Sequence, residues 1–220
     1  MAGNENAVQL KPEVQVFGEH ELLDRIAEGK QLYSHCISIR NPDMQMPQHL
    51  RHAFKEVLEL KFFDVLEGPV ADVTNMQAPT EEDAKKVVEF ISKTRNKATE
   101  YTIHCWGGHS RSTAAALAVL YMILGNEEEA AEYLLNVRPD PKPSPNLTFL
   151  TCFDRLLGSN LVAIGTRLQA AFIEQLDHEL DVFFPSDGIE ELPIAEQEPY
   201  ANGLLAKAAK TQRGENETDI

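Results

Sequence analysis

Two hydrophobic periods alternate along this chain, one typical of strands and one typical of helices. Short runs rich in apolar and β-branched residues are separated by longer stretches in which apolar residues recur every three or four positions. This alternation predicts an α/β domain with a central, mainly parallel sheet of about four or five strands, flanked by helices. In such a sheet, ligands bind at the carboxyl ends of the strands.

The two patterns place most elements within narrow limits. Strands are predicted at residues 13–17, 34–40, 100–104, and around Leu60 and Phe62 with an end near Asp64. Helices are predicted at residues 20–27, 47–58, 80–96, 112–124, 127–138, 147–157 and 161–180. The long connection 64–79 is of a length that often has a functional role. We expect one domain over residues 1–180 and an irregular, acidic tail over 181–220.

Charge and cysteine content exclude several kinds of partner. The formal net charge is -15, so we expect neither nucleic acid nor an anionic membrane to bind. The longest apolar run, 114–124, is too short to cross a bilayer, and the N-terminal residues lack the pattern of a secretory signal. Three cysteines do not suggest a disulfide framework, so we expect a reducing, cytoplasmic location.

One loop carries most of the chemical information. Residues 105–112 join the strand 100–104 to the apolar helix 112–124 and read Cys-Trp-Gly-Gly-His-Ser-Arg-Ser. Gly107 and Gly108 allow backbone amides to turn inward, and a helix N-terminus adds positive potential, so the loop can cradle an anion. Arg111 follows Cys105 after five residues, and its planar guanidinium matches two oxygens of a phosphate group. The loop is therefore a candidate phosphate-binding loop.

The same surroundings favour the thiolate form of Cys105. A helix N-terminus and a nearby guanidinium both stabilise negative charge on sulfur, and a thiolate in a phosphate-shaped cradle is a nucleophile directed at phosphorus. The hydroxyls of Ser110 and Ser112 are both close enough in sequence to donate to the sulfur, and Ser112 is favoured because it directly follows Arg111. His104 is expected to orient the loop rather than to transfer a proton. Trp106 is expected either to line the entrance of the site or to pack against its neighbours.

The loop resembles the His-Cys-x5-Arg-Ser/Thr signature of the protein tyrosine and dual-specificity phosphatases, on His104, Cys105, Arg111 and Ser112. More narrowly, the chain resembles a bacterial group of predicted protein tyrosine phosphatases, on residues 37–42, 104–108 and 144–146. The resemblance covers roughly residues 12–175. Gly107 stands where many relatives have alanine, and His109 occupies a variable position.

The resemblance implies roles for the residues of the loop and for an acid outside it. Cys105, Arg111 and Ser112 are the expected catalytic residues, and residues 106–111 the expected phosphate-binding residues. The family places its general acid, an aspartate, on a loop after an earlier strand. Asp64, which directly follows such a strand, is favoured over Asp72, and Glu67 is a weaker third candidate.

These features predict a cysteine-dependent phosphatase that acts on a phosphorylated protein or a small phosphate ester. No cofactor is expected, and the histidines have no spacing that suggests a metal site. Two alternatives remain open: a phosphatase of phosphoinositides or other non-protein esters on the same fold, and a phosphate-binding module without turnover. The loop interior, residues 106–110, contains no Lys or Arg, which favours a singly phosphorylated substrate over a polyphosphorylated lipid. Cys36 and Cys152 are expected to be structural, with a role as resolving thiol as the alternative.

Overall fold

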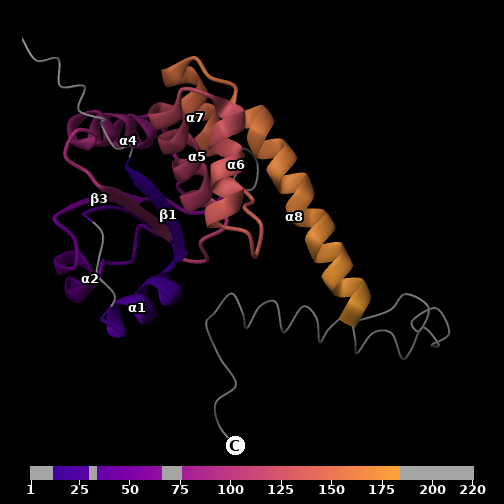
Figure 1. Cartoon of the computed structure of the whole chain (residues 1–220), viewed down its shortest axis with the longest axis horizontal. Coiled ribbons are helices and arrows are strands. Elements are labelled where there is room, and N and C mark those ends of the chain that lie inside the picture. The colour runs from indigo at the N-terminus through magenta and orange to yellow at the C-terminus, as the bar shows by residue number, and fades with distance from the viewer. Residues whose placement is uncertain (1–11, 30–33, 66–75, 184–220) are drawn as a thin grey trace, which may run out of the picture. The chain divides into compact units, whose positions relative to one another are not determined.

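A computed structural model describes residues 12–29, 34–65 and 76–183. Four parallel strands form its central sheet (Figure 1). Its order is β1-β4-β2-β3. The strands are β1 (Glu13–Gly18), β2 (His35–Arg40), β3 (Glu56–Lys61) and β4 (Glu100–Cys105). Because every pairing is parallel, the carboxyl ends of the strands lie along one edge of the sheet. The α/β fold that the alternating pattern predicts is therefore confirmed.

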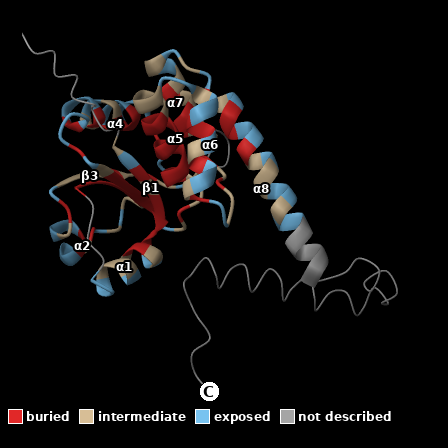
Figure 2. Ribbon diagram, in the orientation of Figure 1, coloured by how far each residue is buried: buried red, intermediate tan, exposed pale blue. Residues whose placement is uncertain are grey.

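Helices cover both faces of this sheet (Figure 1). One face packs against α1 (Glu19–Ala27) and α2 (Gln48–His52) through apolar side chains that include Phe17, Leu22 and Leu50. The other face packs against α4 (Glu81–Thr94), α5 (Arg111–Leu124), α6 (Glu127–Val137) and α7 (Leu147–Leu157). All six residues of β2 and five of the six in β4 are consequently buried (Figure 2).

Small side chains hold α5 close to the sheet. Residues 111–120 of this helix are all buried, and four of them are alanines at positions 114–116 and 118. Alanine lets a helix approach the strands closely, and the helix contacts β4, β1 and β2. Gly125, with a φ of 76°, ends α5 in the left-handed conformation that favours glycine. The start of α5 is therefore fixed against the carboxyl end of β4.

The predicted helix 47–58 is wrong beyond its first half. The helix α2 ends at His52, and β3 begins at Glu56, earlier than the strand predicted around Leu60 and Phe62. Apolar spacing from Leu50 through Phe54 to Leu58 fits a helix as well as a turn followed by a strand. The ladder with β2 is a long-range interaction, and it outweighs the local helical preference.

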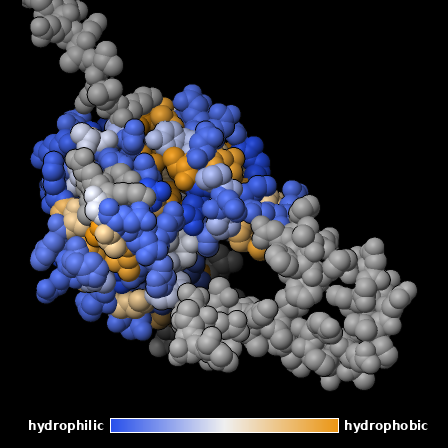
Figure 3. Space-filling model, turned by 60° about the horizontal axis from the view of Figure 1, so that its bottom comes forward, coloured by the Kyte–Doolittle hydropathy of each residue, from blue (hydrophilic) through white to orange (hydrophobic). Residues whose placement is uncertain are grey.

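The chain divides by its contacts into two compact units, residues 1–173 and 174–220. The first contains the sheet, and the described part of the second is the end of α8 (Leu161–Phe183). A division at residue 180, with an irregular tail beyond it, remains a prediction because residues 184–220 lie outside the described part. In Figure 3 the visible described surface is mainly hydrophilic, with apolar areas separated by polar side chains. No described helix combines the length and hydrophobicity needed to traverse a bilayer.

Candidate active site

The loop 106–110 connects the last residue of β4, Cys105, to the first residue of α5, Arg111. Because both elements are packed into the core, the loop has fixed ends. Cys105 is 2% exposed, and its sulfur accepts a hydrogen bond from the backbone N–H of Gly108 at 3.3 Å. The hydroxyl of Ser112 lies 3.2 Å from the same sulfur. The sulfur therefore has an amide and a hydroxyl as polar neighbours.

Gly108 is the residue that the loop conformation requires to be glycine. Its φ is +75°, and a Cβ at this position would stand 2.4 Å from the backbone nitrogen of Gly18 and 2.7 Å from the carbonyl carbon of Phe17. The loop therefore presses directly on the connection between β1 and α1. A backbone hydrogen bond of 3.0 Å from Glu19 to the carbonyl of Trp106 ties the same two segments together.

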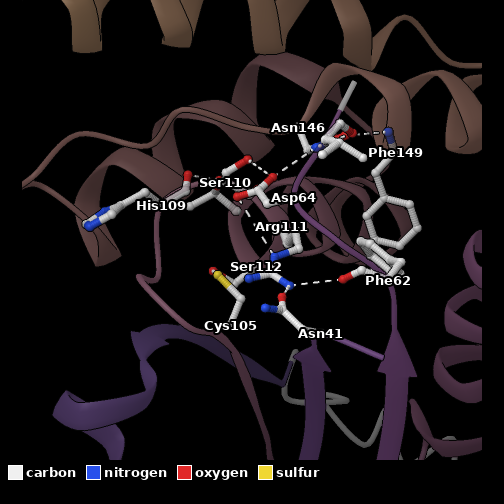
Figure 4. A network of polar contacts seen from close by, with 12 residues as sticks. Asn41, Phe62, Asp64, Cys105, His109, Ser110, Arg111, Ser112, Asn146 and Phe149 are labelled. Atoms are coloured by element: carbon white, nitrogen blue, oxygen red, sulfur yellow. Dashed lines mark hydrogen bonds and ion pairs between the residues drawn. The ribbon is translucent and has the colours of Figure 1, made fainter. Parts of the chain in front are cut away.

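Arg111 is held by groups at the ends of two neighbouring strands (Figure 4). Its Nη1 donates to Asn41 Oδ1 at 2.8 Å and to the carbonyl oxygen of Phe62 at 3.0 Å. Asn41 follows β2, and Phe62 follows β3. Both bonds use one nitrogen, and Nε has no hydrogen-bond partner although it is buried. The Nε edge of the guanidinium is therefore not committed to a structural hydrogen bond.

Asp64 lies beside the loop, next to Arg111. Its Oδ1 accepts hydrogen bonds from the Ser110 hydroxyl at 2.7 Å and from the Asn146 side-chain amide at 3.0 Å, and its Oδ2 lies 3.8 Å from Arg111 Nε (Figure 4). The side chain of Asp64 is 37% exposed, so solvent reaches it. Of the three acids considered from the sequence, the structure places this one at the loop. Asp72 and Glu67 lie outside the described residues.

Two side chains of the loop face aromatic neighbours. Trp106, 37% exposed, packs edge-to-face against His20 with ring centroids 5.5 Å apart. His109 stacks against Phe172 of α8 at 6.4 Å, and a Cβ at Gly107 would stand 3.1 Å from the His109 ring. Alanine at position 107 would therefore require the His109 ring to shift by a few tenths of an ångström.

The charge state of His109 bears on the charge of the loop. Burial lowers the pKa of His109 below its ordinary value, the Arg138 guanidinium lowers it further, and the carboxylates of Glu21 and Asp64 oppose both effects. The net shift favours the neutral imidazole. The loop side chains 106–110 then supply no full positive charge, and the cation next to them is Arg111.

His104 lies in the middle of the sheet, paired with Phe17 of β1 and Ser38 of β2. Its ring is fully buried, and neither ring nitrogen has a hydrogen-bond partner. Burial, with a smaller contribution from the Arg40 guanidinium, lowers the pKa of His104 from 6.5 to about 3. A neutral, inaccessible imidazole cannot exchange protons with a substrate, and the role of His104 in orienting the loop remains a prediction.

This shift predicts acid sensitivity. Between pH 6.5 and about 3 the unfolded chain protonates His104 while the folded chain does not, so the free energy of unfolding falls as the pH falls. The contribution is at most about 1.4 kcal/mol per pH unit. We expect His104→Gln to show a shallower loss of stability than the wild type in urea unfolding at pH 6.5, 5.5 and 4.5. Parallel pH dependences would contradict this assignment, because other titrating groups are the same in both proteins.

Of the other two cysteines, Cys36 lies on the opposite face of the sheet, whereas Cys152, 6% exposed in α7, belongs to the same core cluster as Cys105. Cys36 packs with Phe17 and Leu22 on the α1 side of the sheet, whereas Cys105 belongs to the cluster on the α5 side. Burial raises the pKa of the Cys36 thiol far above its ordinary value, so it stays protonated. All three cysteines are free thiols. In the part of the chain that the structure describes, no group of three or more His, Cys, Asp or Glu side chains has the arrangement of a metal site.

Sequence reasoning did not single out the two asparagines that hold this site. Asn41 and Asn146 contact Arg111 and Asp64 across 70 and 82 residues of sequence. A weak signal existed for Asn41, because a polar residue directly after a buried strand lies at the edge where ligands bind. Asn146 lies in the segment 144–146 that carries the bacterial resemblance, but by residue type and position it indicates only a helix N-cap, a common place for asparagine.

No protein-family model and no curated protein matches the chain. Among solved structures it is similar to DUSP15 (20% identity, 73% of this chain and 93% of that one, TM-score 0.47) and human DUSP28 (16%, 74% and 98%, 0.46). It is also similar to PTPMT1 in complex with PI(5)P (17%, 72% and 94%, 0.45). The narrower resemblance to the bacterial group is not tested by these comparisons. Identities and TM-scores this low are insufficient to transfer an activity or a substrate.

Proposed function

We propose that this chain is a phosphoric monoester hydrolase of the protein tyrosine and dual-specificity phosphatase type, acting through a phosphocysteine intermediate. The observation that carries the proposal is the surroundings of the Cys105 sulfur. It lies at the N-terminus of a buried helix, accepts the Gly108 amide and contacts the Ser112 hydroxyl. Arg111 directly precedes Ser112, and its Nη1 is held by hydrogen bonds to Asn41 and Phe62. This arrangement suits a nucleophile and an anion clamp at one place.

In the first step the Cys105 thiolate attacks phosphorus and an S–P bond forms. The bond between phosphorus and the ester oxygen breaks, and Asp64 gives its proton to that oxygen, so the alcohol leaves neutral. In the second step water attacks phosphorus, Asp64 takes the proton of the water, and the S–P bond breaks. Inorganic phosphate leaves, and Cys105 returns to the thiolate. The Ser112 hydroxyl, 3.2 Å from the sulfur, stabilises the departing thiolate in this second step.

Backbone amides and one guanidinium supply the positive potential in this scheme. Inward-facing amides of the loop and the Nε edge of Arg111 surround the place where the phosphoryl oxygens would lie. A bidentate guanidinium neutralises the charge that grows on those oxygens in the transition state. We therefore propose hydrolysis without a metal ion or another cofactor.

The loop favours a singly phosphorylated substrate, either a phosphoprotein or a small ester. Its side chains provide no Lys or Arg between Cys105 and Arg111, and the lowered pKa of His109 favours a neutral ring. A polyphosphorylated lipid would need further cations to balance its charge. Three free thiols fit a reducing compartment, so we propose a cytoplasmic location.

A substrate panel tests this proposal directly. Phosphate release is measured from para-nitrophenyl phosphate, from peptides carrying phosphotyrosine, phosphoserine or phosphothreonine, and from a soluble phosphoinositide, all in EDTA. We expect hydrolysis of the aryl ester and of at least one phosphopeptide. Turnover of the phosphoinositide alone would favour a phosphatase of phosphoinositides. If no ester is hydrolysed, the result favours a phosphate-binding module without turnover.

Replacing Asp64 by asparagine tests the general acid. We expect Asp64→Asn to lower kcat/KM for phenyl phosphate by about 10² to 10⁴-fold, because the phenolate then leaves without a proton. The loss should shrink for para-nitrophenyl phosphate, whose leaving group needs little protonation. The basic limb of the pH profile of kcat/KM should also flatten, because that limb reports deprotonation of the acid.

Asp72→Asn is the matched control. It removes a carboxylate from the same connection, and we expect it to leave both the dependence on the leaving group and the basic limb close to wild type. If Asp72→Asn shows these two effects and Asp64→Asn does not, the assignment is reversed.

A further inference from the structure

Asn146 joins three segments that meet at the candidate site (Figure 4). It is the N-cap of α7 and is 3% exposed, and its Oδ1 accepts the N–H of Phe149 at 3.0 Å. Its backbone N–H donates to the carbonyl of Ser110 in the loop at 3.2 Å. Its side-chain amide donates to Asp64 Oδ1 at 3.0 Å and to the carbonyl of Val65 at 3.3 Å. Phe149 offers a donor and the other two groups offer acceptors, so these partners fix the orientation of the side-chain amide.

Capping a helix does not require this side-chain amide. The N-cap position needs only an oxygen that accepts a backbone N–H, which serine, threonine or aspartate also provide. Asn126, the N-cap of α6, shows the simpler case, because its Oδ1 accepts the N–H groups of Glu128 and Glu129 at the surface. At Asn146 the NH₂ group instead points to the candidate acid. That second contact needs an explanation beyond the helix.

The contact distinguishes the two oxygens of Asp64. A carboxylate oxygen has about two lone-pair positions, and Oδ1 already accepts two hydrogen bonds, from Ser110 and Asn146. A proton on Oδ1 would face one of these two donors. The proton of the acid form therefore belongs on Oδ2, the oxygen that lies 3.8 Å from Nε of Arg111, on the side of the phosphate clamp.

We propose that Asn146 is a positioning residue for the general acid. With the Ser110 hydroxyl, it anchors Oδ1 of Asp64, so that Oδ2 carries the proton to the leaving oxygen. This rests on the proposed function, because it assigns a support to the acid of that reaction. The backbone hydrogen bond from Asn146 to Ser110 also ties the start of α7 to the loop, so the residue that anchors Asp64 has a fixed position relative to the loop. Asn146 acts through Asp64 and need not touch the substrate.

The test uses Asn146→Ser in the full chain. Serine keeps the N-cap oxygen for Phe149 and removes the NH₂ donor, so helix stability should change little. We expect kcat/KM for phenyl phosphate to fall by about 10 to 100-fold, the scale of a small misplacement of a reacting group. For para-nitrophenyl phosphate the loss should be much smaller. Asn126→Ser makes the same substitution at an N-cap away from the site, and both esters should then react at the wild-type rate.

A double-mutant cycle separates positioning from general structural damage. If Asn146 acts through Asp64, then Asn146→Ser should cause no further loss of kcat/KM once Asp64→Asn is present. Additive losses would overturn the proposal, as would equal losses on the two esters. Should Asn146→Ser fail to fold, Asn146→Thr also keeps a cap oxygen for Phe149, lacks the NH₂ donor and adds no charge beside Asp64. The same outcomes then decide.

These results also separate this proposal from the proposed function. If the wild type hydrolyses phenyl phosphate, and both losses in Asn146→Ser are equal, only the role of Asn146 is overturned. If the wild type releases no phosphate from either ester, the hydrolase proposal is overturned, and the role of Asn146 with it.

Discussion

Cys105→Ser is expected to abolish hydrolysis while the protein still binds phosphate. A serine hydroxyl is not ionised near neutral pH, so the attacking group is lost, and turnover should fall by about 10⁴-fold or more. The other parts of the anion site stay, because Arg111 is held by Asn41 and Phe62, and the loop is held against Gly18. Phosphate release measures the first effect, and calorimetric titration with inorganic phosphate measures the second.

Cys36→Ser is the control for this experiment. It makes the same atomic change in a buried cysteine on the other face of the sheet, within the cluster formed with α1 and α2. We expect near wild-type turnover from the folded fraction, even where stability is reduced. Residual turnover close to wild type in Cys105→Ser would show that another group is the nucleophile. Loss of phosphate binding together with activity would show that the thiol, rather than the cradle, holds the anion.

The second large effect is expected for Arg111→Lys, with kcat/KM reduced by about 10² to 10³-fold. A lysine ammonium carries the same charge but has no planar fork. In the structure Nη1 is occupied by Asn41 and the Phe62 carbonyl, which leaves the Nε edge for the phosphoryl oxygens. One lysine ammonium cannot bind both Asn41 with the Phe62 carbonyl and the phosphoryl oxygens in the geometry that the guanidinium provides. The affinity for inorganic phosphate should fall as well.

Arg138→Lys is the matched control for the loss of the fork. Arg138 is also buried and paired, with Nη1 2.6 Å from the Glu21 carboxylate, and it has no hydrogen bond to Asp64 or to the Cys105 sulfur among the contacts described. We expect its replacement to change kcat/KM by only a few-fold. If Arg111→Lys has an equally small effect, a positive charge alone is sufficient for activity, and the proposed bidentate contact of Arg111 with the phosphate is wrong.

Local patterns predicted those parts of the fold that local forces determine. The strand that ends at Cys105 and the helix that begins at Arg111 are recognisable because a short apolar run is followed, after the loop, by a longer apolar segment of helical length. The helix predicted at 80–96 also begins close to its predicted start, because Thr80 and Asp83 form a capping box there. The boundary between α2 and β3 was predicted wrongly, because pairing with β2 decides it, and each residue of β3 pairs with a residue 21 positions earlier.

The candidate site divides in the same way. Cys105 and Arg111 could be proposed from the sequence because both belong to one stretch of eight consecutive residues, and their catalytic roles remain a prediction. The hydrogen bonds that hold Arg111 and Asp64 could not be predicted, since they join the ends of β2 and β3 to the loop and to α7. Which acid lies next to the loop depended on the path of the chain after β3. Sequence order alone gives no distance across the sheet.

The strand order has a consequence for how the molecule is made. In β1-β4-β2-β3, the strand that carries Cys105 lies between two strands that are synthesised well before it, and Glu13 pairs with Glu100. During translation β1 and β2 are therefore synthesised before β4, the strand with which both of them pair. Pairing across such sequence separations is slow, because a long loop must close before any contact compensates. The candidate site of the nascent chain is complete only after β4, α5 and the start of α7 have been synthesised. A truncated translation product that ends before residue 146 would therefore lack part of the candidate site.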